Sequence, residues 1–362
     1  MADAADHAFM AHALRLAEQG LYTTTPNPRV GCVIVREGGI VGQGWHERAG
    51  APHAETQAIA QAGDRAKGAT AYVNLEPCSH HGRTPPCTEA LVAAGVARVV
   101  AAMRDPNPQV AGQGFARLES AGIAVERGVL EAQASELNAG FVSRMTRGRP
   151  WMRVKIAAGL DGKTALENGV SKWITGPVAR RDVHHWRARS CAVMTGIGTL
   201  AEDDPRLDVR EVETSRQPLR IVVDSRLRIS PQARILESGG VLVATASRDA
   251  TRVRAVEEAG AEVLCLPNPA GKVDLEALAA ELGRRGLNEV LVEAGMNLHS
   301  ALLHAGVVDE LLVYYAPLLL GSRGRGMFDL GVLTSLDSAL RVEVCDRRQL
   351  GPDLRLIARI RR

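Results

Sequence analysis

The chain has 362 residues, more than the roughly 250–300 at which one hydrophobic core stops growing, so we expect two domains. Hydrophobic residues at 46% and charged residues at 23% are typical of soluble globular proteins and exclude a disordered or fibrous chain. The formal net charge of +3 and the 3% of aromatic residues argue against a nucleic-acid partner, which requires a basic surplus or many stacking side chains.

The amino terminus places two aspartates before any basic residue and has no uninterrupted apolar run, so it lacks the charge order of a signal peptide. No segment reaches the roughly 18 apolar residues of a membrane span. We therefore expect a cytoplasmic protein with no membrane partner, whose six cysteines form no structural disulfides. A close cysteine pair in such a compartment, here Cys78 and Cys87, is better explained as metal-binding or catalytic.

The first part of the chain alternates between helical and strand-like segments. An amphipathic helix over residues 9–17 ends near Gly20, and a polar loop at 23–29 precedes two strands within 30–45 around a Glu-Gly-Gly turn. Further along, the pattern predicts helices at 53–63 and 88–95, strands at 70–75 and 97–103, another helix and strand, and a last helical stretch at 130–145. Such alternation predicts an α/β layer fold.

The cluster Thr-Arg-Gly-Arg-Pro at 146–150 is short, basic and ends in a helix breaker. We place the domain boundary there, with domains at 1–147 and 148–362. Beyond it, strand-like segments occur at 151–165, 219–225, 240–246, 261–266, 289–295 and 309–317, among helix candidates. Residues 340–360 predict an antiparallel hairpin about Gly351 and Pro352, so the second domain is α/β as well.

His53, Cys78 and Cys87 form a candidate metal-ligand set. One imidazole and two thiolates suit tetrahedral Zn²⁺, and three protein ligands leave a fourth position for water, as in catalytic zinc sites. We expect Cys78 to begin an irregular segment after a strand and Cys87 to open a helix, where the helix dipole favours the thiolate form. Glu55 is the candidate base that takes a proton from this water and passes it on.

These residues match the H-x-E and P-C-x-x-C pattern of zinc deaminases with one departure, because eight residues instead of two separate the cysteines. His53 and Glu55 are two residues apart and would not share a helix face, so the sequence does not explain how both reach one water. A closed zinc knuckle, with His80 or His81 as the fourth ligand, remains an alternative.

The segments HAE at 53–55 and NLEPCSHHGRTPPC at 74–87, with PNPRVGCVIV and GWHERAGAPHAE upstream, closely resemble the bifunctional deaminase-reductase family of riboflavin biosynthesis. The likeness spans nearly the whole chain. It implies a cytidine-deaminase-like three-layer domain that removes an amino group from a pyrimidine bearing a phosphorylated ribosylamino group.

The resemblance also implies which residues touch this first substrate. His80, His81 and Arg83 would offer donors to its phosphate, on a loop whose prolines limit its movement. Asn27 and His46 would contact it too, although each could equally be a turn residue and a surface histidine.

The stretch GIGTLA at 196–201 follows an apolar run and satisfies the G-x-G-x-x-A pattern of Rossmann dinucleotide sites. That pattern needs a helix starting at the glycines, and Pro205 would break such a helix within its second turn, so we reject a Rossmann fold. A strand ending at Gly295, followed by a helix from about Asn297, is a better cradle for a pyrophosphate. A plain strand-turn-helix packing unit explains the same segment equally well.

Six further segments, VKIAAGLDGKTA, SKWITG, HHWRARS, GIGTLAEDDPRL, VVDS and VEAGMNLHSALL, are similar, in order, to the reductase domain of the same family. They imply a dihydrofolate-reductase-like fold that uses NADPH. The implied cofactor contacts are Ala157, Trp173, Thr199, Asp203, Ser225, Gly295, Met296, Asn297, Leu298, His299, Ser300 and Ala301. The implied substrate contacts are Lys155, Ser171, Arg187, Leu207, Arg210 and Glu293, with Lys155 either a proton donor or a phosphate contact.

We therefore expect a homo-oligomeric two-step enzyme. A zinc deaminase would act on 2,5-diamino-6-ribosylamino-4(3H)-pyrimidinone 5′-phosphate, and an NADPH reductase would then convert its ribosyl group to ribityl. A nucleic-acid deaminase with an accessory domain and a zinc-stapled binding protein are the alternatives. Deamination of RNA or DNA would indicate the first, and unchanged activity after Glu55→Gln would indicate the second.

Overall fold

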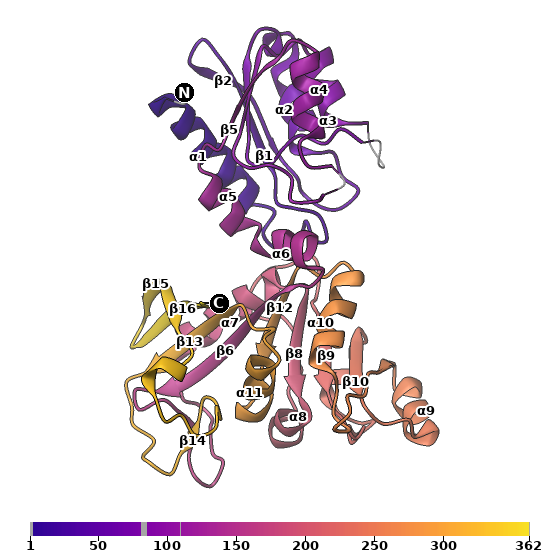
Figure 1. The fold of residues 1–362 in the computed structure, drawn as a ribbon, viewed down its shortest axis with the longest axis vertical. Helices are drawn as coiled ribbons and strands as arrows, with labels where there is room; N and C mark the ends of the chain where they lie inside the picture. Colours follow the sequence, from indigo (N-terminus) through magenta and orange to yellow (C-terminus); the bar gives the residue numbers. More distant parts are fainter. Residues whose placement is uncertain (1–2, 81–84, 109, 362) are drawn as a thin grey trace. The chain divides into compact units, whose positions relative to one another are not determined.

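The computed structural model describes residues 3–80, 85–108 and 110–361. The chain folds as two compact units, Met1–Gly148 and Arg149–Arg362, each with its own sheet and helices (Figure 1). Within the described ranges, no helix is long and apolar enough to cross a bilayer.

The first unit is built on a five-stranded sheet with the order β2-β1-β3-β4-β5. The strands are β1 (Gly31–Arg36), β2 (Gly39–Trp45), β3 (Thr70–Val73), β4 (Arg98–Ala101) and β5 (Ala124–Arg127). β1 pairs antiparallel with β2 and β3, whereas β3, β4 and β5 are parallel. Residues 31–35 of β1 are all buried, which is typical of a strand covered by helices on both faces.

Helices cover both faces of this sheet. α1 (Ala4–Glu18), α5 (Glu131–Leu137) and α6 (Ala139–Arg147) pack on one face, and α2 (Ala54–Ala62), α3 (Cys87–Ala93) and α4 (Gln113–Ser120) pack on the other (Figure 1). The faces alternate along each strand, so that Val33 joins the α1 side of the core and Ile34 the α2 side. The predicted three-layer α/β fold is confirmed.

The expected single helical stretch at 130–145 is wrong in one respect, because it is divided at Asn138 into α5 and α6. Asn138 is 1% exposed, and its side chain accepts from the backbone N–H of Arg29 at 2.8 Å and donates to the Arg29 carbonyl at 3.0 Å. Two buried hydrogen bonds to another segment thus stabilise a break that local helix propensity does not predict.

The second unit is built on a nine-stranded sheet with the order β11-β10-β9-β8-β12-β6-β13-β16-β15. In chain order these are β6 (Trp151–Gly159), β8 (Ala192–Gly196), β9 (Leu219–Val223), β10 (Val241–Thr245), β11 (Ala261–Cys265), β12 (Glu289–Glu293), β13 (Glu310–Ala316), β15 (Val342–Leu350) and β16 (Asp353–Ile360). Seven strands are parallel, and the predicted carboxyl-terminal hairpin, β15 and β16, adds two antiparallel strands at the β13 edge.

α7 (Pro177–Arg189) and α9 (Ala250–Glu258) pack on one face of this sheet, and α10 (Leu275–Arg284) and α11 (Met296–His304) on the other. The short helix α8 (Ile197–Asp203) follows β8 directly, and β7 (Lys163–Ala165) pairs with β14 (Arg325–Gly326) in a small separate sheet. α8 ends two residues before Pro205, as expected from the helix-breaking effect of proline, so it is shorter than a Rossmann helix would be.

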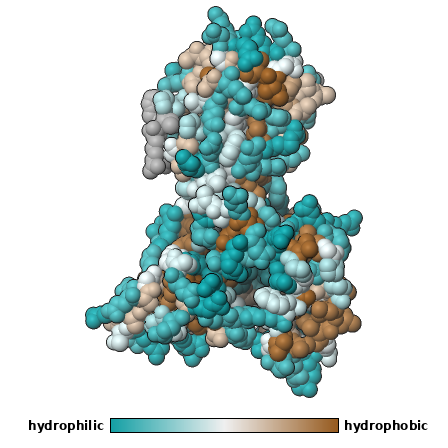
Figure 2. Space-filling view, turned by 180° about the vertical axis from the view of Figure 1, so that it is seen from behind, coloured by the Kyte–Doolittle hydropathy of each residue, from teal (hydrophilic) through white to brown (hydrophobic). Residues whose placement is uncertain are grey.

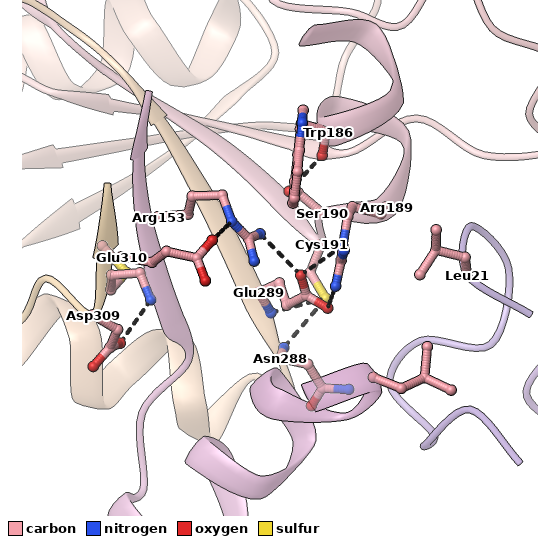
Figure 3. A network of polar contacts seen from close by, with 12 residues as sticks. Leu21, Arg153, Trp186, Arg189, Ser190, Cys191, Asn288, Glu289, Asp309 and Glu310 are labelled. Atoms are coloured by element: carbon pink, nitrogen blue, oxygen red, sulfur yellow. Dashed lines mark hydrogen bonds and ion pairs between the residues drawn. The ribbon is translucent and has the colours of Figure 1, made fainter. Parts of the chain in front are cut away.

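A buried ion network joins the amino ends of three strands of the second unit (Figure 3). Arg153 of β6, 3% exposed, bonds Glu310 of β13 and, at 3.1 Å, Glu289 of β12. Arg189 of α7 bonds the same Glu289 carboxylate at 3.0 Å, and both guanidinium groups lie against the ring of Trp186. The network lies at the strand ends opposite to those where ligands of parallel sheets bind, so we ascribe to it a structural role.

The second unit also exposes apolar side chains around its outer edge strand, β15. Val342 and Val344 on this strand are 43% and 56% exposed, and Val332 and Leu336 before it are 93% and 85% exposed. Apolar atoms gather over part of this unit in Figure 2.

Candidate metal centre and reductase site

The predicted ligand set converges in the first unit. The ligand atoms of His53, Cys78 and Cys87 all lie within 4.8 Å of one another. His53 Nδ1 is 3.1 Å from Cys87 Sγ and 3.6 Å from Cys78 Sγ. An imidazole nitrogen and two sulfurs this close, half-buried to buried, are a suitable donor set for a tetrahedral cation.

The local backbone explains how these residues meet. His53 is the N-cap of α2, with extended φ and ψ of −72° and 160°, and Cys87 is the first residue of α3. Cys78 lies in an irregular loop after β3, as expected from the sequence. Its sulfur nevertheless accepts the backbone N–H of Cys87 at 3.3 Å, and therefore receives a hydrogen bond from the first residue of α3.

Glu55 reaches the same site because His53 is not part of the helix. The rule that residues two apart do not share a helix face applies inside a helix, whereas the extended N-cap turns the imidazole independently. Glu55 is 4% exposed, and burial, followed by the charge of Cys78, raises the pKa of its carboxyl group. A buried carboxyl group of raised pKa beside two sulfurs is suited to take up and release a proton.

The sulfurs themselves fit a divalent cation. The hydrogen bond between the two thiols lowers the pKa of Cys78 to about 4 and raises that of Cys87. Because two neighbouring thiolates repel each other, one proton stays between the two sulfurs. A metal ion that takes the place of this proton allows both cysteines to ionise.

Asn27 and His46 meet each other next to this site. The amide of Asn27 donates to His46 Nε2 at 3.0 Å, and His46 Nδ1 donates to the carbonyl of Pro52 at 3.2 Å. His46 is 3% exposed, so the description of a surface histidine is wrong, and its ring stands edge-on to His53 with centroids 5.3 Å apart. Burial lowers the pKa of His46, which keeps the ring neutral and its two nitrogens distinct.

The predicted phosphate loop is only partly described. His81 and Arg83 lie outside the described residues, and His80 is exposed. Burial raises the pKa of the Asp105 carboxyl group, and the neighbouring His80 acts to lower it.

Glu76, which is not among the residues predicted from the sequence, supports the metal loop, the irregular segment after β3 that carries Cys78. This buried carboxylate accepts backbone N–H groups from Asp105, Gly112, Gly114 and Phe115 at 2.8–3.3 Å and so caps α4. Its position directly before Pro77 and Cys78 is the only signal for this role in the sequence.

In the second unit, a half-buried charged cluster lies where β6 and β12 run side by side. Lys155 pairs with Glu293 in the parallel register, with 4.0 Å between Nζ and Oε2. Arg187 of α7 bonds both oxygens of Glu293, at 2.5 and 3.0 Å. Although burial acts to raise it, the charge of Arg187 holds the pKa of Glu293 at about 2, and burial lowers the pKa of Lys155.

The other predicted substrate residues lie around this cluster to different degrees. Leu207 is buried at 3% exposure, and Arg210 is exposed and pairs with Asp208. The carbonyl of Asp208 accepts from Arg187 at 2.9 Å, which connects this segment to the cluster. Ser171 is half-buried, and its neighbour Lys172 pairs with Asp203 of α8 at 2.8 Å.

The predicted cofactor residues follow the carboxyl ends of β6, β8, β9 and β12, the edge where parallel sheets bind ligands. Gly295 is the N-cap of α11, and a side chain added there would lie 3.9 Å from Thr199 of α8. The first turns of α8 and α11 thus lie close together, and the free N–H groups of α11 suit a pyrophosphate. Trp173 is 70% exposed beneath the guanidinium of Arg180.

Three of these side chains are bonded within the protein. His299 accepts from the N–H of Ala294, Ser300 bonds the Met296 carbonyl, and Ser225 accepts from the N–H of Val273. Only the backbone or the remaining surface of these three residues is therefore available to a cofactor. Ala157 lies near the carboxyl end of β6, Met296, Asn297 and Leu298 form the first turn of α11, and Ala301 lies in the middle of α11.

Comparisons with known proteins agree with this geometry. Residues 3–103 match the family described as the cytidine and deoxycytidylate deaminase zinc-binding region, and residues 150–356 match the RibD C-terminal domain. The riboflavin biosynthesis protein RibD of Escherichia coli is 50% identical over 96% of this chain and 98% of its own length. RibD of Haemophilus influenzae is 47% identical, over 97% and 96%.

Solved structures are similar over the whole length. Acinetobacter baumannii RibD superimposes with a TM-score of 0.92 at 45% identity, covering 99% of both chains. A Thermotoga maritima diaminohydroxyphosphoribosylaminopyrimidine deaminase/5-amino-6-(5-phosphoribosylamino)uracil reductase gives 0.87 at 34% identity, again over 99% of both. The chain therefore belongs to the RibD family, and it is a bifunctional enzyme of riboflavin biosynthesis, with a zinc-dependent deaminase and an NADPH-dependent reductase.

Proposed function

We propose that the first reaction is the hydrolytic deamination of 2,5-diamino-6-ribosylamino-4(3H)-pyrimidinone 5′-phosphate, and the second the reduction of its ribosyl group to ribityl. The observation that carries the first half is the convergence of His53, Cys78 and Cys87 beside the buried Glu55. We assign deamination to residues 1–147 and reduction to residues 148–362.

In the deaminase, His53, Cys78 and Cys87 would hold Zn²⁺, which would supply an activated water when bound. Glu55 would hold the proton that moves to the leaving amino group, a role to which its buried position and raised pKa are suited. Asn27 and His46 orient the pyrimidine, because each keeps a fixed hydrogen-bonding state through the bond between them. His80, His81 and Arg83 bind the phosphate.

In the reductase, NADPH supplies the hydride that reduces C1 of the opened ribosylamino group. The backbone N–H groups at the start of α11, from Gly295 onward, bind its pyrophosphate, and Ala157, Trp173, Thr199, Asp203 and Ser225 surround it. Arg187 and Arg210 bind the substrate, and the bidentate bonds of Arg187 to Glu293 fix the guanidinium for this contact. Lys155, whose pKa burial lowers, would give its proton to the nitrogen bonded to C1 as C1 receives the hydride.

The test is a comparison of Glu55→Gln with the unchanged enzyme. We expect the variant to keep its zinc, measured by atomic absorption, and to lose ammonia release by a factor of at least about 10². It should still oxidise NADPH when given the deaminated substrate. Zinc-loaded Glu55→Gln with normal ammonia release would contradict the assignment of the base.

We also propose that the chain is a homo-oligomer with no nucleic-acid or membrane partner. An outer strand of nine residues with exposed Val342 and Val344 supports this, because unpaired apolar edges favour association. Analytical ultracentrifugation should give a mass above that of one chain, and Val344→Asp should lower it. A monomer at micromolar concentration would contradict the proposal.

A further inference from the structure

The segment that follows α8, residues 204–210, contains backbone conformations that need contacts with other residues to be stable. Asp204 and Leu207 both have left-handed φ, 40° and 54°, although neither is glycine. This conformation is unfavourable for residues with a side chain and persists only where surrounding contacts fix it. Leu207 is buried, and Arg210 at the end of the segment is exposed.

Three side chains fix residues 208–210. Arg187 donates to the carbonyl of Asp208 at 2.9 Å. Gln217 bonds both backbone groups of Val209, at 2.7 and 3.0 Å. His184 accepts the backbone N–H of Arg210 at Nδ1, with 3.2 Å between the two nitrogens.

The bond to His184 requires one protonation state of its ring. A backbone N–H can only donate, so Nδ1 must carry no proton, and the ring must be the neutral tautomer with its proton on Nε2. His184 lies on α7 one turn before Arg187 and is 5% exposed.

The charged groups around His184 favour this neutral state. Arg187 faces His184 from α7. Arg210 and Glu211 face it from the loop after α8, and Glu293 faces it from β12. Burial, with the positive charges of Arg187 and Arg210, lowers the pKa of His184, and the two carboxylates oppose this only partly.

We propose that His184 is a positioning residue of the reductase, whose unprotonated Nδ1 holds the Arg210 amide and so fixes residues 207–210 for substrate binding. The inference rests on the proposed function, in which Leu207 and Arg210 contact the substrate. It adds to that function a residue that does not itself touch substrate, and it makes substrate affinity depend on the protonation of one histidine.

The experiment compares His184→Leu with His184→Asn in the full-length, zinc-loaded enzyme. Asparagine places an oxygen acceptor near the position of Nδ1, whereas leucine fills the space without an acceptor. With 5-amino-6-(5-phosphoribosylamino)uracil as substrate, KM should rise about five- to tenfold in His184→Leu, with kcat within about twofold. His184→Asn should restore KM to within about twofold, and ammonia release by the deaminase should be unchanged in both.

The pH dependence of KM gives an independent readout that does not rely on His184→Leu. As pH falls through the lowered pKa of His184, the ring gains a proton on Nδ1, the acceptor is lost, and KM of the unchanged enzyme should rise. His184→Asn should lack this rise. Since both enzymes use the same substrate, ionisation of the substrate phosphate affects both profiles equally.

Arg210→Ala separates this inference from the proposed function. If Arg210→Ala leaves KM unchanged, the assignment of the substrate site is wrong. If Arg210→Ala raises KM but His184→Leu does not, or if His184→Asn behaves as His184→Leu, the positioning role is overturned. Parallel acid profiles of the unchanged enzyme and His184→Asn would overturn it as well.

Discussion

Arg153 bonds two carboxylates in the interior of the second unit, where all three side chains are at most 3% exposed (Figure 3). Ionic groups in such a place carry a desolvation cost of several kcal/mol each, which is offset only while every charge has a partner. Glu289 is bonded to both Arg153 and Arg189, whereas Glu310 has its ion pair with Arg153.

We expect Arg153→Met to lower the free energy of unfolding of the second unit by about 3–5 kcal/mol, because Glu310 and part of Glu289 would be left as unpaired buried charges. Urea unfolding measures this change. The matched control is Arg206→Met, which removes an exposed pair with Glu237 and should cost less than about 1 kcal/mol. Equal effects of the two substitutions would show that burial does not govern the network.

Asp6 gives a pH dependence to the first unit. Arg98 bonds both of its carboxylate oxygens, at 2.8 and 2.9 Å, and the hydroxyl of Tyr72 donates to it at 2.9 Å. These contacts, those of Arg98 foremost, lower the pKa of Asp6 from 3.8 to about 2.

Because the folded pKa lies below the unfolded value, the stabilisation is complete above about pH 4 and is lost as pH falls towards 2. We expect Asp6→Asn to be less stable by about 1–2 kcal/mol at pH 7, with a difference that narrows at pH 3. Loss of zinc in acid would weaken both proteins and leave their difference unaffected. A gap that stays constant down to pH 3 would argue against an ionic origin.

At the scale of elements, α4 lies so close to the loop that carries Cys78 that position 114 of the helix must be glycine. A side chain at Gly114 would come within 2.1 Å of the carbonyl oxygen of Pro77, which directly precedes Cys78. The loop that carries Cys78 is therefore fixed to α4 in two ways: Pro77 lies against Gly114, and the carboxylate of Glu76 accepts the Gly114 N–H.

We expect Gly114→Ala to displace Pro77, to destabilise the first unit by about 1–3 kcal/mol, and to lose zinc during dialysis that the unchanged protein withstands. Gly39→Ala is the control, because the nearest atom to its added side chain is 3.6 Å away. Full zinc retention in Gly114→Ala would mean that the loop moves without disturbing Cys78.

Most elements could be predicted from the sequence because hydrophobic periodicity is local. α1, the β1–β2 hairpin, the alternation that follows and the terminal hairpin all lie where the pattern places them. The break at Asn138 could not be predicted, since its cause is a pair of hydrogen bonds to Arg29, 109 residues away.

For the whole molecule, the candidate metal centre and the candidate reductase site lie in different units. The predicted zinc ligands lie in Met1–Gly148, and Lys155, Arg187 and Glu293 lie in Arg149–Arg362. We expect a zinc chelator to abolish ammonia release and to leave NADPH oxidation with the deaminated substrate unchanged, and added Zn²⁺ to restore the first activity. Ammonia release from protein that is metal-free by atomic absorption would contradict a zinc deaminase.

The sequence by itself determined the kinds of chemistry. His53, Glu55, Cys78 and Cys87 lie in two short segments whose residue types and spacing indicate a zinc-activated water, and alternation of apolar residues indicates two α/β domains. Such signals are local, so they can be read along the chain. Only the tertiary structure decided which distant groups meet: the extended N-cap that brings His53 beside Glu55, the Glu76 carboxylate beneath α4, and His184 beside the Arg210 amide. These contacts depend on how helices pack on the sheets, and no spacing in the sequence records that packing.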